Sequence, residues 1–287
     1  MRYWKTTIPL GGISGSNPRS AECCYPRSVQ LLRIAHLTDL HLPAEASEVV
    51  AGRDADQALE SILSRVLALH PDLLLLTGDL TDAGDASAYL RLQARLRPLN
   101  CPVLALPGNH DHPARMRRTL GIRYWGVGRV MQLGEWRVMG LSSYWRGHAD
   151  GRLGHAQRCW LDHQLIQFPS RPTLLALHHP PIATGSAWLD AMGLRDAVAF
   201  RSLLRRHPQV RAVLFGHGHQ ALDLRQGGCR FLGTPSTVRQ FLPQSDQFAW
   251  SAEPGGWRWL TLSKTGRIHT QVVMASVIDR EASHFCH

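Results

Sequence analysis

Five short apolar runs, each followed at once by a loop rich in Asp, Asn, His and Gly, constrain this chain most strongly. The runs are residues 29–37, 73–77, 103–106, 173–177 and 212–215. Segments with apolar residues at helical spacing, 55–69 and 86–96, separate the first three runs, and a helical segment at 197–206 precedes the last. Apolar runs that alternate with helices predict an α/β fold whose strands are covered on their faces.

The rest of the chain adds further elements rather than a second domain. Residues 130–142 are typical of short alternating strands, 153–165 are typical of a helix, and the last third is rich in β-type sequence. We find no internal repeat and no shift in composition. We therefore expect one domain over 29–275, a flexible leader at 1–28 that is rich in Gly, Ser, Pro and Arg, and a C-terminal tail at 276–287.

Composition allows a large buried core and excludes several classes of protein. The 287 residues are 44% hydrophobic and 19% charged, which excludes disorder of the whole chain. No apolar run reaches the length of about 18 residues that a transmembrane helix needs, and residues 1–10 lack the apolar region of a secretory signal. The six cysteines, none spaced C-x-x-C, are typical of reduced thiols. We expect a cytoplasmic protein with no membrane partner.

The formal charge of +10 indicates an anionic partner. Nucleic acid is disfavoured, because the 32 Lys and Arg residues are scattered and the densest clusters, Arg115–Arg118 and residues 201–206, are short. We find no long basic stretch interleaved with aromatic residues of the kind that binds single strands. A small anion such as a nucleotide remains the favoured partner.

The loops that follow the apolar runs carry metal-binding side chains. They are Asp39-Leu40-His41, Gly78-Asp79, Gly108-Asn109-His110-Asp111, His178-His179-Pro180-Pro181 and Gly216-His217-Gly218-His219. Strands of an α/β sheet place such loops at one rim, and the glycines suit tight turns that aim the next side chain inward. Oxygen and imidazole donors suit iron, manganese or zinc. At least seven donors exceed the need of one ion, so we infer two divalent ions that share a bridging ligand.

Taken in this order, the motifs D-x-H, GD, GNHD, HHPP and GHGH resemble the calcineurin-like metallophosphoesterase superfamily. Residues 178–241 resemble more closely the bacterial 3′,5′-cyclic-AMP phosphodiesterases, through Ser186–Asp190, Leu194–Asp196, Thr234–Thr237 and Gln240-Phe241. This resemblance implies a four-layer α/β/β/α sandwich with two mixed sheets, which is the metallophosphoesterase fold, and a two-metal centre.

The resemblance also implies roles for individual residues. The implied ligands are Asp39, His41, Asp79 and His219 for the first metal, with Asp79 as the bridge, and Asn109, His178 and His217 for the second. His179, His36 and His112 are expected to be structural. The implied substrate contacts are His41, Asp79, Asn109, His110 and His219, with Trp188 and Phe241 as candidate base-stacking groups. Core packing remains the alternative for these two aromatic residues.

The resemblance implies hydrolysis of 3′,5′-cyclic AMP to 5′-AMP by a metal-bridging hydroxide. His110 would be the general acid, and Asp82 would orient it unless Asp82 is only a solvated turn carboxylate. The alternative is another metallophosphoesterase that acts on nucleic acid, dinucleotide, phospholipid or nucleotide-sugar phosphate esters. A non-catalytic scaffold is disfavoured because no expected ligand is missing. Metal identity, cyclic AMP against cyclic GMP, and oligomeric state stay open.

Overall fold

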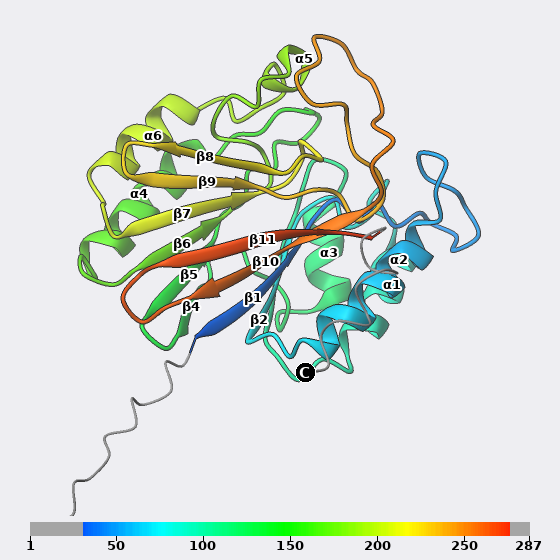
Figure 1. The fold of residues 1–287 in the computed structure, drawn as a ribbon, viewed down its shortest axis with the longest axis horizontal. Helices are drawn as coiled ribbons and strands as arrows, with labels where there is room; N and C mark the ends of the chain where they lie inside the picture. The colour runs from blue at the N-terminus through cyan, green and yellow to red at the C-terminus, as the bar shows by residue number, and fades with distance from the viewer. Residues whose placement is uncertain (1–30, 276–287) are drawn as a thin grey trace, which may run out of the picture.

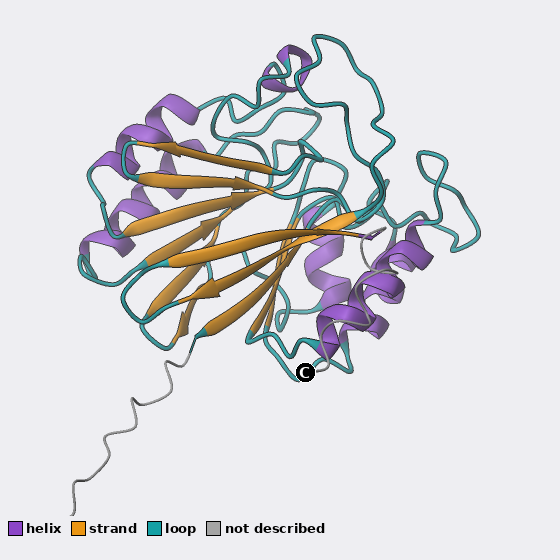
Figure 2. Ribbon diagram, in the orientation of Figure 1, coloured by secondary structure: helices purple, strands orange, loops and turns teal. Residues whose placement is uncertain are grey.

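The computed structural model describes residues 31–275, which form two β-sheets with helices on their outer sides (Figure 1; Figure 2). The helices are α1 (Ala55–Ala68), α2 (Ala86–Leu96), α3 (Pro113–Leu120), α4 (Gly154–Ile166), α5 (Ala187–Asp190) and α6 (Ala197–Arg205). The strands are β1 (Leu32–Leu37), β2 (Leu73–Thr77), β3 (Val103–Leu106), β4 (Val130–Leu133), β5 (Trp136–Gly140), β6 (Thr173–Ala176), β7 (Val210–Phe215), β8 (Leu222–Gln226), β9 (Cys229–Gly233), β10 (Gly256–Leu262) and β11 (Ile268–Met274).

Both sheets are mixed, as the sequence predicts. The first has the order β11-β10-β1-β2-β3. In it β1, β2 and β3 are parallel, β10 runs antiparallel to β1, and β11 runs antiparallel to β10. The second has the order β4-β5-β6-β7-β9-β8, in which β5, β6, β7 and β9 are parallel. Five parallel strands, β1, β2, β3, β6 and β7, therefore bring their carboxyl ends to one side of the molecule.

Three separate apolar cores make the molecule a four-layer sandwich. On β2, Leu74 and Leu76 pack against α1 and α2, whereas Leu73 and Leu75 point to the other sheet and meet residues such as Leu174. The third core lies between the second sheet and helices α4 and α6. Because side chains alternate across a strand, strands that are apolar throughout bury both faces. The predicted α/β/β/α sandwich is confirmed.

Three short elements were not predicted. In α3 only Met116 and Leu120 are buried, so the apolar period is too short to stand out among its arginines, and the helix begins with the His112 cap and Pro113. Strand β8 lies at a sheet edge and is mostly exposed, so it shows no apolar alternation. Helix α5 is a single turn. Elements with little buried surface leave little pattern in a sequence.

Some expectations about the whole chain concern segments outside this description. The expected leader at 1–28 and tail at 276–287 lie outside the described residues, so the domain limits stay predictions. Within residues 31–275, Cys101, Cys159 and Cys229 are free thiols. In the same range, no helix is both long enough and apolar enough to cross a membrane.

Candidate metal centre

The loops after β1, β2, β3, β6 and β7 converge, and their side chains form one buried polar cluster. Ligand atoms lie within 4.8 Å of one another in four groups. These groups are Asp39, His41 and His219; His41, Asp79 and His110; Asp39, Asp79 and His178; and His178, His179 and His217. Asn109 joins them through its Oδ1, which lies 3.1 Å from His178 Nε2. The structure thus brings together all seven side chains that the sequence predicts as metal ligands.

The first half of the cluster is built around two facing imidazoles. His41 Nε2 and His219 Nε2 lie 3.3 Å apart, and His219 Nε2 lies 3.3 Å from Asp39 Oδ1. His219 Nδ1 donates to the Arg239 carbonyl at 2.8 Å, and His41 Nδ1 donates to the Asp82 carboxylate at 3.1 Å. In the neutral rings, both Nε2 atoms then turn lone pairs toward one point. A cation at that point would relieve their repulsion, and partners on Nδ1 are typical of metal-binding histidines.

The second half of the cluster also gathers acceptor atoms. His178 Nδ1 donates to the Thr77 carbonyl at 2.8 Å, which leaves Nε2 facing Asn109 Oδ1 and Asp79 Oδ2, the latter at 3.2 Å. His217 Nε2 is buried and has no hydrogen-bond partner. An orphaned buried nitrogen beside converging acceptors is the environment that a divalent cation satisfies. The residues therefore fit the metal site that the sequence predicts.

Asp79 lies between the two halves. Its Oδ2 is 3.2 Å from His178 Nε2 and 3.9 Å from His41 Nε2, whereas its Oδ1 accepts the His110 backbone N–H at 2.9 Å. Burial opposes the ionised carboxylate, but the neighbouring His178, His110 and His41 together hold the pKa of Asp79 well below its usual range. Burial likewise opposes charge on His178, but Asp79 and Asp39 raise its pKa to about 9. The site stabilises positive charge between its carboxylates.

The backbone at the cluster is strained. Five of the seven predicted ligands have φ between 44° and 63°: Asp39, His41, Asp79, His217 and His219. Left-handed backbone costs a residue other than Gly about 1–3 kcal/mol. Such strain persists where the surrounding structure requires it, and it concentrates at functional sites. Backbone bonds from Asp39 N–H to the Gly78 carbonyl and from His41 N–H to the Asp79 carbonyl, both 2.9 Å, hold two of these turns.

Glycines allow the loops to approach one another. Gly78 has φ 103°, so the predicted turn explains its identity. At Gly108 and Gly216 glycine is required because neighbouring atoms leave no room for a side chain. A Cβ at Gly108 would lie 2.2 Å from Asp79 Oδ1, and one at Gly216 would lie 2.0 Å from Thr38 Oγ1. Any side chain at these two positions would displace the strand ends that carry Asp79 and Asp39.

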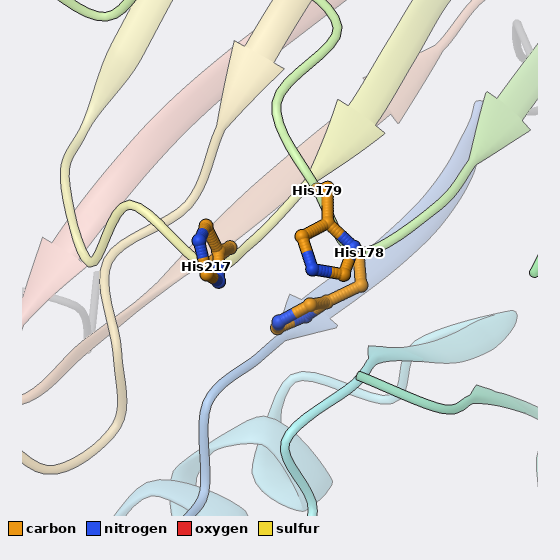
Figure 3. A group of neighbouring side chains, drawn as sticks. All are labelled: His178, His179 and His217. Carbon is orange, nitrogen blue, oxygen red and sulfur yellow. The ribbon is translucent and has the colours of Figure 1, made fainter. Parts of the chain in front are cut away.

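Three further histidines have structural roles, as expected. His179 lies beside His178 and His217 (Figure 3), but both of its nitrogens are engaged, with Ser143 Oγ at 2.8 Å and the Ala149 carbonyl at 3.1 Å. Both nitrogens of His36 contact threonine hydroxyls, each at 2.7 Å. His112 accepts an N–H bond that caps α3. None of these three presents a free nitrogen to the cluster.

Asp82 contacts His110 through its backbone rather than through its carboxylate. The Asp82 carbonyl accepts from His110 Nδ1 at 2.8 Å, whereas its carboxylate binds His41 Nδ1. Burial opposes charge on His41, but the bond to Asp82 and the nearby Asp79 raise its pKa. Asp82 therefore supports a predicted metal ligand with its side chain and the predicted acid with its main chain.

This division of roles predicts the effect of Asp82→Ala. We expect metal affinity to fall about 10- to 100-fold, the usual cost of losing a group that orients a ligand, with kcat little changed at saturating metal. Titration of the metal-free protein with Mn²⁺ measures the affinity, and Asp85→Ala is the control, because Asp85 makes no side-chain cap bond. A large fall in kcat at saturating Mn²⁺ would show that the carboxylate orients His110 after all.

Asp111, the last residue of the GNHD motif, has a role that sequence reasoning did not assign. It is buried and accepts the N–H of Leu80 at 3.1 Å, the N–H of Gly108 at 2.9 Å and the hydroxyl of Tyr89 at 2.8 Å. Burial and the nearby Asp79 raise its pKa to about 6. Asp111 thus ties the loop after β2 to the loop after β3. Its place in the motif was the only sequence signal.

Asp111→Ala should destabilise the protein strongly. Each buried polar group left unpaired costs about 1–3 kcal/mol, and three N–H groups (Leu80, Thr81 and Gly108) and the hydroxyls of Thr81 and Tyr89 lose an acceptor. We expect the free energy of unfolding to fall by about 3 kcal/mol or more in urea titrations of the metal-free protein. Asp111→Asn keeps one acceptor oxygen and should lose less. Equal unfolding midpoints for Asp111→Ala and the wild type would disprove this role.

A pocket of about 360 Å³ opens beside the cluster. Five of the seven predicted ligands line one wall with His110, and four aromatic side chains line another. The five ligands are His41, Asp79, Asn109, His217 and His219, and the aromatic residues are Trp188, Phe241, Phe248 and Trp250. Phe241 is stacked on His219 at 4.2 Å and contacts Trp188 edge-on at 5.0 Å. Trp188 and Phe241 are partly exposed. They lie in the pocket wall rather than in an apolar core.

A sandwich of two mixed sheets, with Asp, Asn and His side chains gathered at its strand ends, defines a metallophosphoesterase. A family model described as calcineurin-like phosphoesterase matches residues 32–221. The chain belongs to this family, and the sequence-based assignment is confirmed.

Similar proteins agree with this assignment. A probable cyclic nucleotide phosphodiesterase of Synechococcus is 38% identical, over 88% of this chain and 95% of the relative. A 3′,5′-cyclic adenosine monophosphate phosphodiesterase of Vibrio vulnificus is 37% identical, over 88% and 92%. A purple acid phosphatase of yellow lupin superposes with a TM-score of 0.63 at 14% identity, over 88% of this chain and 53% of the longer chain. That last similarity concerns the fold alone.

Proposed function

We propose that this protein is a 3′,5′-cyclic-nucleotide phosphodiesterase that hydrolyses cyclic AMP to 5′-AMP. The observation that carries the proposal is the pocket, which has residues of a cluster that could hold metal ions on one wall and aromatic side chains on the other. A phosphodiester needs the first wall and a nucleobase suits the second. The names of the relatives, at up to 38% identity, support the same substrate class.

The cluster would hold two divalent ions, iron, manganese or zinc. Asp39, His41 and His219 would bind the first, Asn109, His178 and His217 the second, and Asp79 both. When bound, such ions lower the pKa of water and neutralise charge on phosphoryl oxygens. These side chains would fix where the phosphate binds, because most of them are buried. Hydrogen bonds from Nδ1 of His178 and of His219 to backbone carbonyls also hold those rings in place.

His110 is proposed to protonate the leaving 3′-oxygen. Its Nδ1–H donates to the Asp82 carbonyl at 2.8 Å, which fixes the orientation of the ring. The side chain is exposed and lines the pocket beside Asp79 and His41, with its ring centroid 4.8 Å from that of His41. Nε2 is therefore free to donate a proton to the substrate.

The expected cytoplasmic location stays a prediction.

A substrate panel on protein reconstituted with Fe²⁺, Mn²⁺ or Zn²⁺ tests the proposal. It compares cyclic AMP, cyclic GMP, bis(p-nitrophenyl) phosphate and single-stranded DNA, with metal-free protein as control. We expect release of 5′-AMP from cyclic AMP and little cleavage of DNA. Hydrolysis of bis(p-nitrophenyl) phosphate without release of 5′-AMP would reject the cyclic nucleotide as substrate while leaving the family assignment intact.

A further inference from the structure

The layer between the two sheets changes from apolar to polar just below the metal cluster. Over most of its length this layer is an apolar core. At the end next to the cluster, four buried polar side chains take over: His36, Thr77, Thr234 and Arg258. Two residues farther from the cluster on each chain segment, the side chains are apolar again: Ile34, Leu75, Leu232 and Leu260. Burying polar groups costs free energy unless they are hydrogen-bonded, so these four are expected to have a role that apolar side chains would not fill.

The four polar side chains, here called the His36 network, are joined by hydrogen bonds. His36 Nε2 contacts Thr77 Oγ1 and His36 Nδ1 contacts Thr234 Oγ1, each at 2.7 Å. Arg258 Nε donates to the same Thr234 hydroxyl at 3.3 Å, and Arg258 Nη2 donates to the Gly233 carbonyl at 2.7 Å. His36, Thr77 and Arg258 lie on strands of the first sheet, whereas Thr234 directly follows β9 of the second. The network therefore ties one sheet to the other.

Both ends of the His36 network reach backbone that carries predicted metal ligands. Thr77 ends β2, and its carbonyl accepts from Nδ1 of His178 at 2.8 Å. The Thr234 N–H donates at 3.0 Å to the carbonyl of Phe215, which lies two residues before His217. His178 and His217 lie beside each other after β6 and β7, with ring centroids 5.2 Å apart (Figure 3). The network is thus one residue layer away from the second half of the cluster.

The predicted metal centre is divided between the two sheets. Loops of the first sheet supply Asp39, His41, Asp79 and Asn109, and loops of the second supply His178, His217 and His219. A metal site must be held to within about 0.5 Å of its working geometry, so the two sheets need a fixed relative position at this end. Apolar packing is not directional, whereas hydrogen bonds have preferred lengths and angles. Hydrogen bonds between the sheets supply the directional constraint.

We propose that the His36 network fixes the position of one sheet relative to the other at the cluster, and so holds the two halves of the metal centre in register before metal binds. Its members are positioning residues, since they act through Thr77 and Phe215 backbone atoms rather than on an ion. The inference rests on the proposed two-metal centre, and it adds what holds the halves of that centre together.

Two variants that keep side-chain shape or volume test the proposal. His36→Leu removes both ring contacts, and Thr77→Val removes one hydroxyl but keeps the carbonyl that binds His178. We expect the Mn²⁺ affinity of each metal-free protein to fall about 10-fold, the lower end of the range for losing a group that orients a ligand. Calorimetric titration measures the affinity and urea titration confirms folding. His36→Gln, which has both a donor and an acceptor, should recover part of the loss. If His36→Leu does not fold, Thr77→Val decides.

Gln209→Met is the matched control for a purely structural effect. Gln209 is buried, and its Nε2 donates to the Leu165 carbonyl at 2.9 Å just before β7, at the end of that strand opposite His217. This variant should be less stable in urea but keep wild-type Mn²⁺ affinity. The visible absorption of Co²⁺-loaded protein, which reports ligand geometry, should change in Thr77→Val and not in Gln209→Met. Wild-type Mn²⁺ affinity in Thr77→Val, or an equal loss of affinity in Gln209→Met, would overturn the proposal.

The same titrations separate this inference from the proposed metal centre. If the wild-type protein does not bind two Mn²⁺ ions per chain, the proposed centre fails, and the positioning role fails with it. If the wild type binds two ions and the folded variants bind them with equal affinity, only the positioning role fails.

Discussion

Metal and hydrolytic activity will be lost together when Asp79 is replaced by Ala. One carboxylate oxygen of Asp79 faces both His178 and His41, so its removal weakens both halves of the cluster at once. Removing one group that stabilises a developing charge costs about 10²–10³-fold in kcat, and a shared ligand should cost at least that much. Elemental analysis of the purified protein and the rate on bis(p-nitrophenyl) phosphate are the two measurements.

Asp72→Ala is the matched control for Asp79→Ala. Asp72 precedes β2 and pairs with Arg33 at the opposite end of the strand from Asp79. This variant should keep two ions per chain and full activity. If Asp79→Ala still bound two ions per chain, Asp79 would not bridge them, and the pairing of ligands proposed here would have to be redrawn.

The convergence of the predicted ligands was predictable from sequence because each of them follows an apolar strand. Strand burial is a local property that a run such as residues 73–77 displays directly, and parallel strands must deliver their next residues to a common rim. Nothing more than strand order and motif order was needed to gather Asp39, Asp79 and His178. The order of the motifs then supplied the family.

The directions of hydrogen bonds were not predictable from sequence. Asp82 uses its carbonyl for His110 and its carboxylate for His41, and that choice depends on where two separate loops place their backbone. Asp111 and Arg258 escaped assignment for the same reason. Their partners are distant in sequence, such as Leu80 and Gly233, and only the folded chain brings them within reach.

The positive φ values at the cluster also had no signal in the sequence. Asp, Asn and His tolerate left-handed backbone better than other residues, so their presence in loops permits this conformation without requiring it. Asp39 and His219 adopt it because neighbouring strands fix both ends of each turn. The sequence therefore specifies which groups meet, and tertiary packing specifies how they face one another.

His110→Ala should lower kcat for cyclic AMP by about 10²–10⁴-fold, the usual contribution of a general acid. Metal content should be unchanged, because the imidazole of His110 is bound to the Asp82 carbonyl and is exposed, unlike the buried ligands. The loss on bis(p-nitrophenyl) phosphate should be much smaller, because p-nitrophenolate leaves without a proton whereas a ribose 3′-oxygen does not. Steady-state rates on both substrates and elemental analysis test this.

The comparison of leaving groups separates proton transfer from positioning. His112→Ala serves as the control, since His112 caps α3 two residues away and does not line the pocket. It should cost about 1 kcal/mol of stability, as a lost helix cap does, without changing kcat on either substrate. A histidine that only positions the phosphate would slow both reactions equally, because both present the same phosphodiester to the metal cluster. Equal losses on both substrates in His110→Ala would therefore assign His110 to phosphate binding and leave the general acid to be found among the other pocket residues.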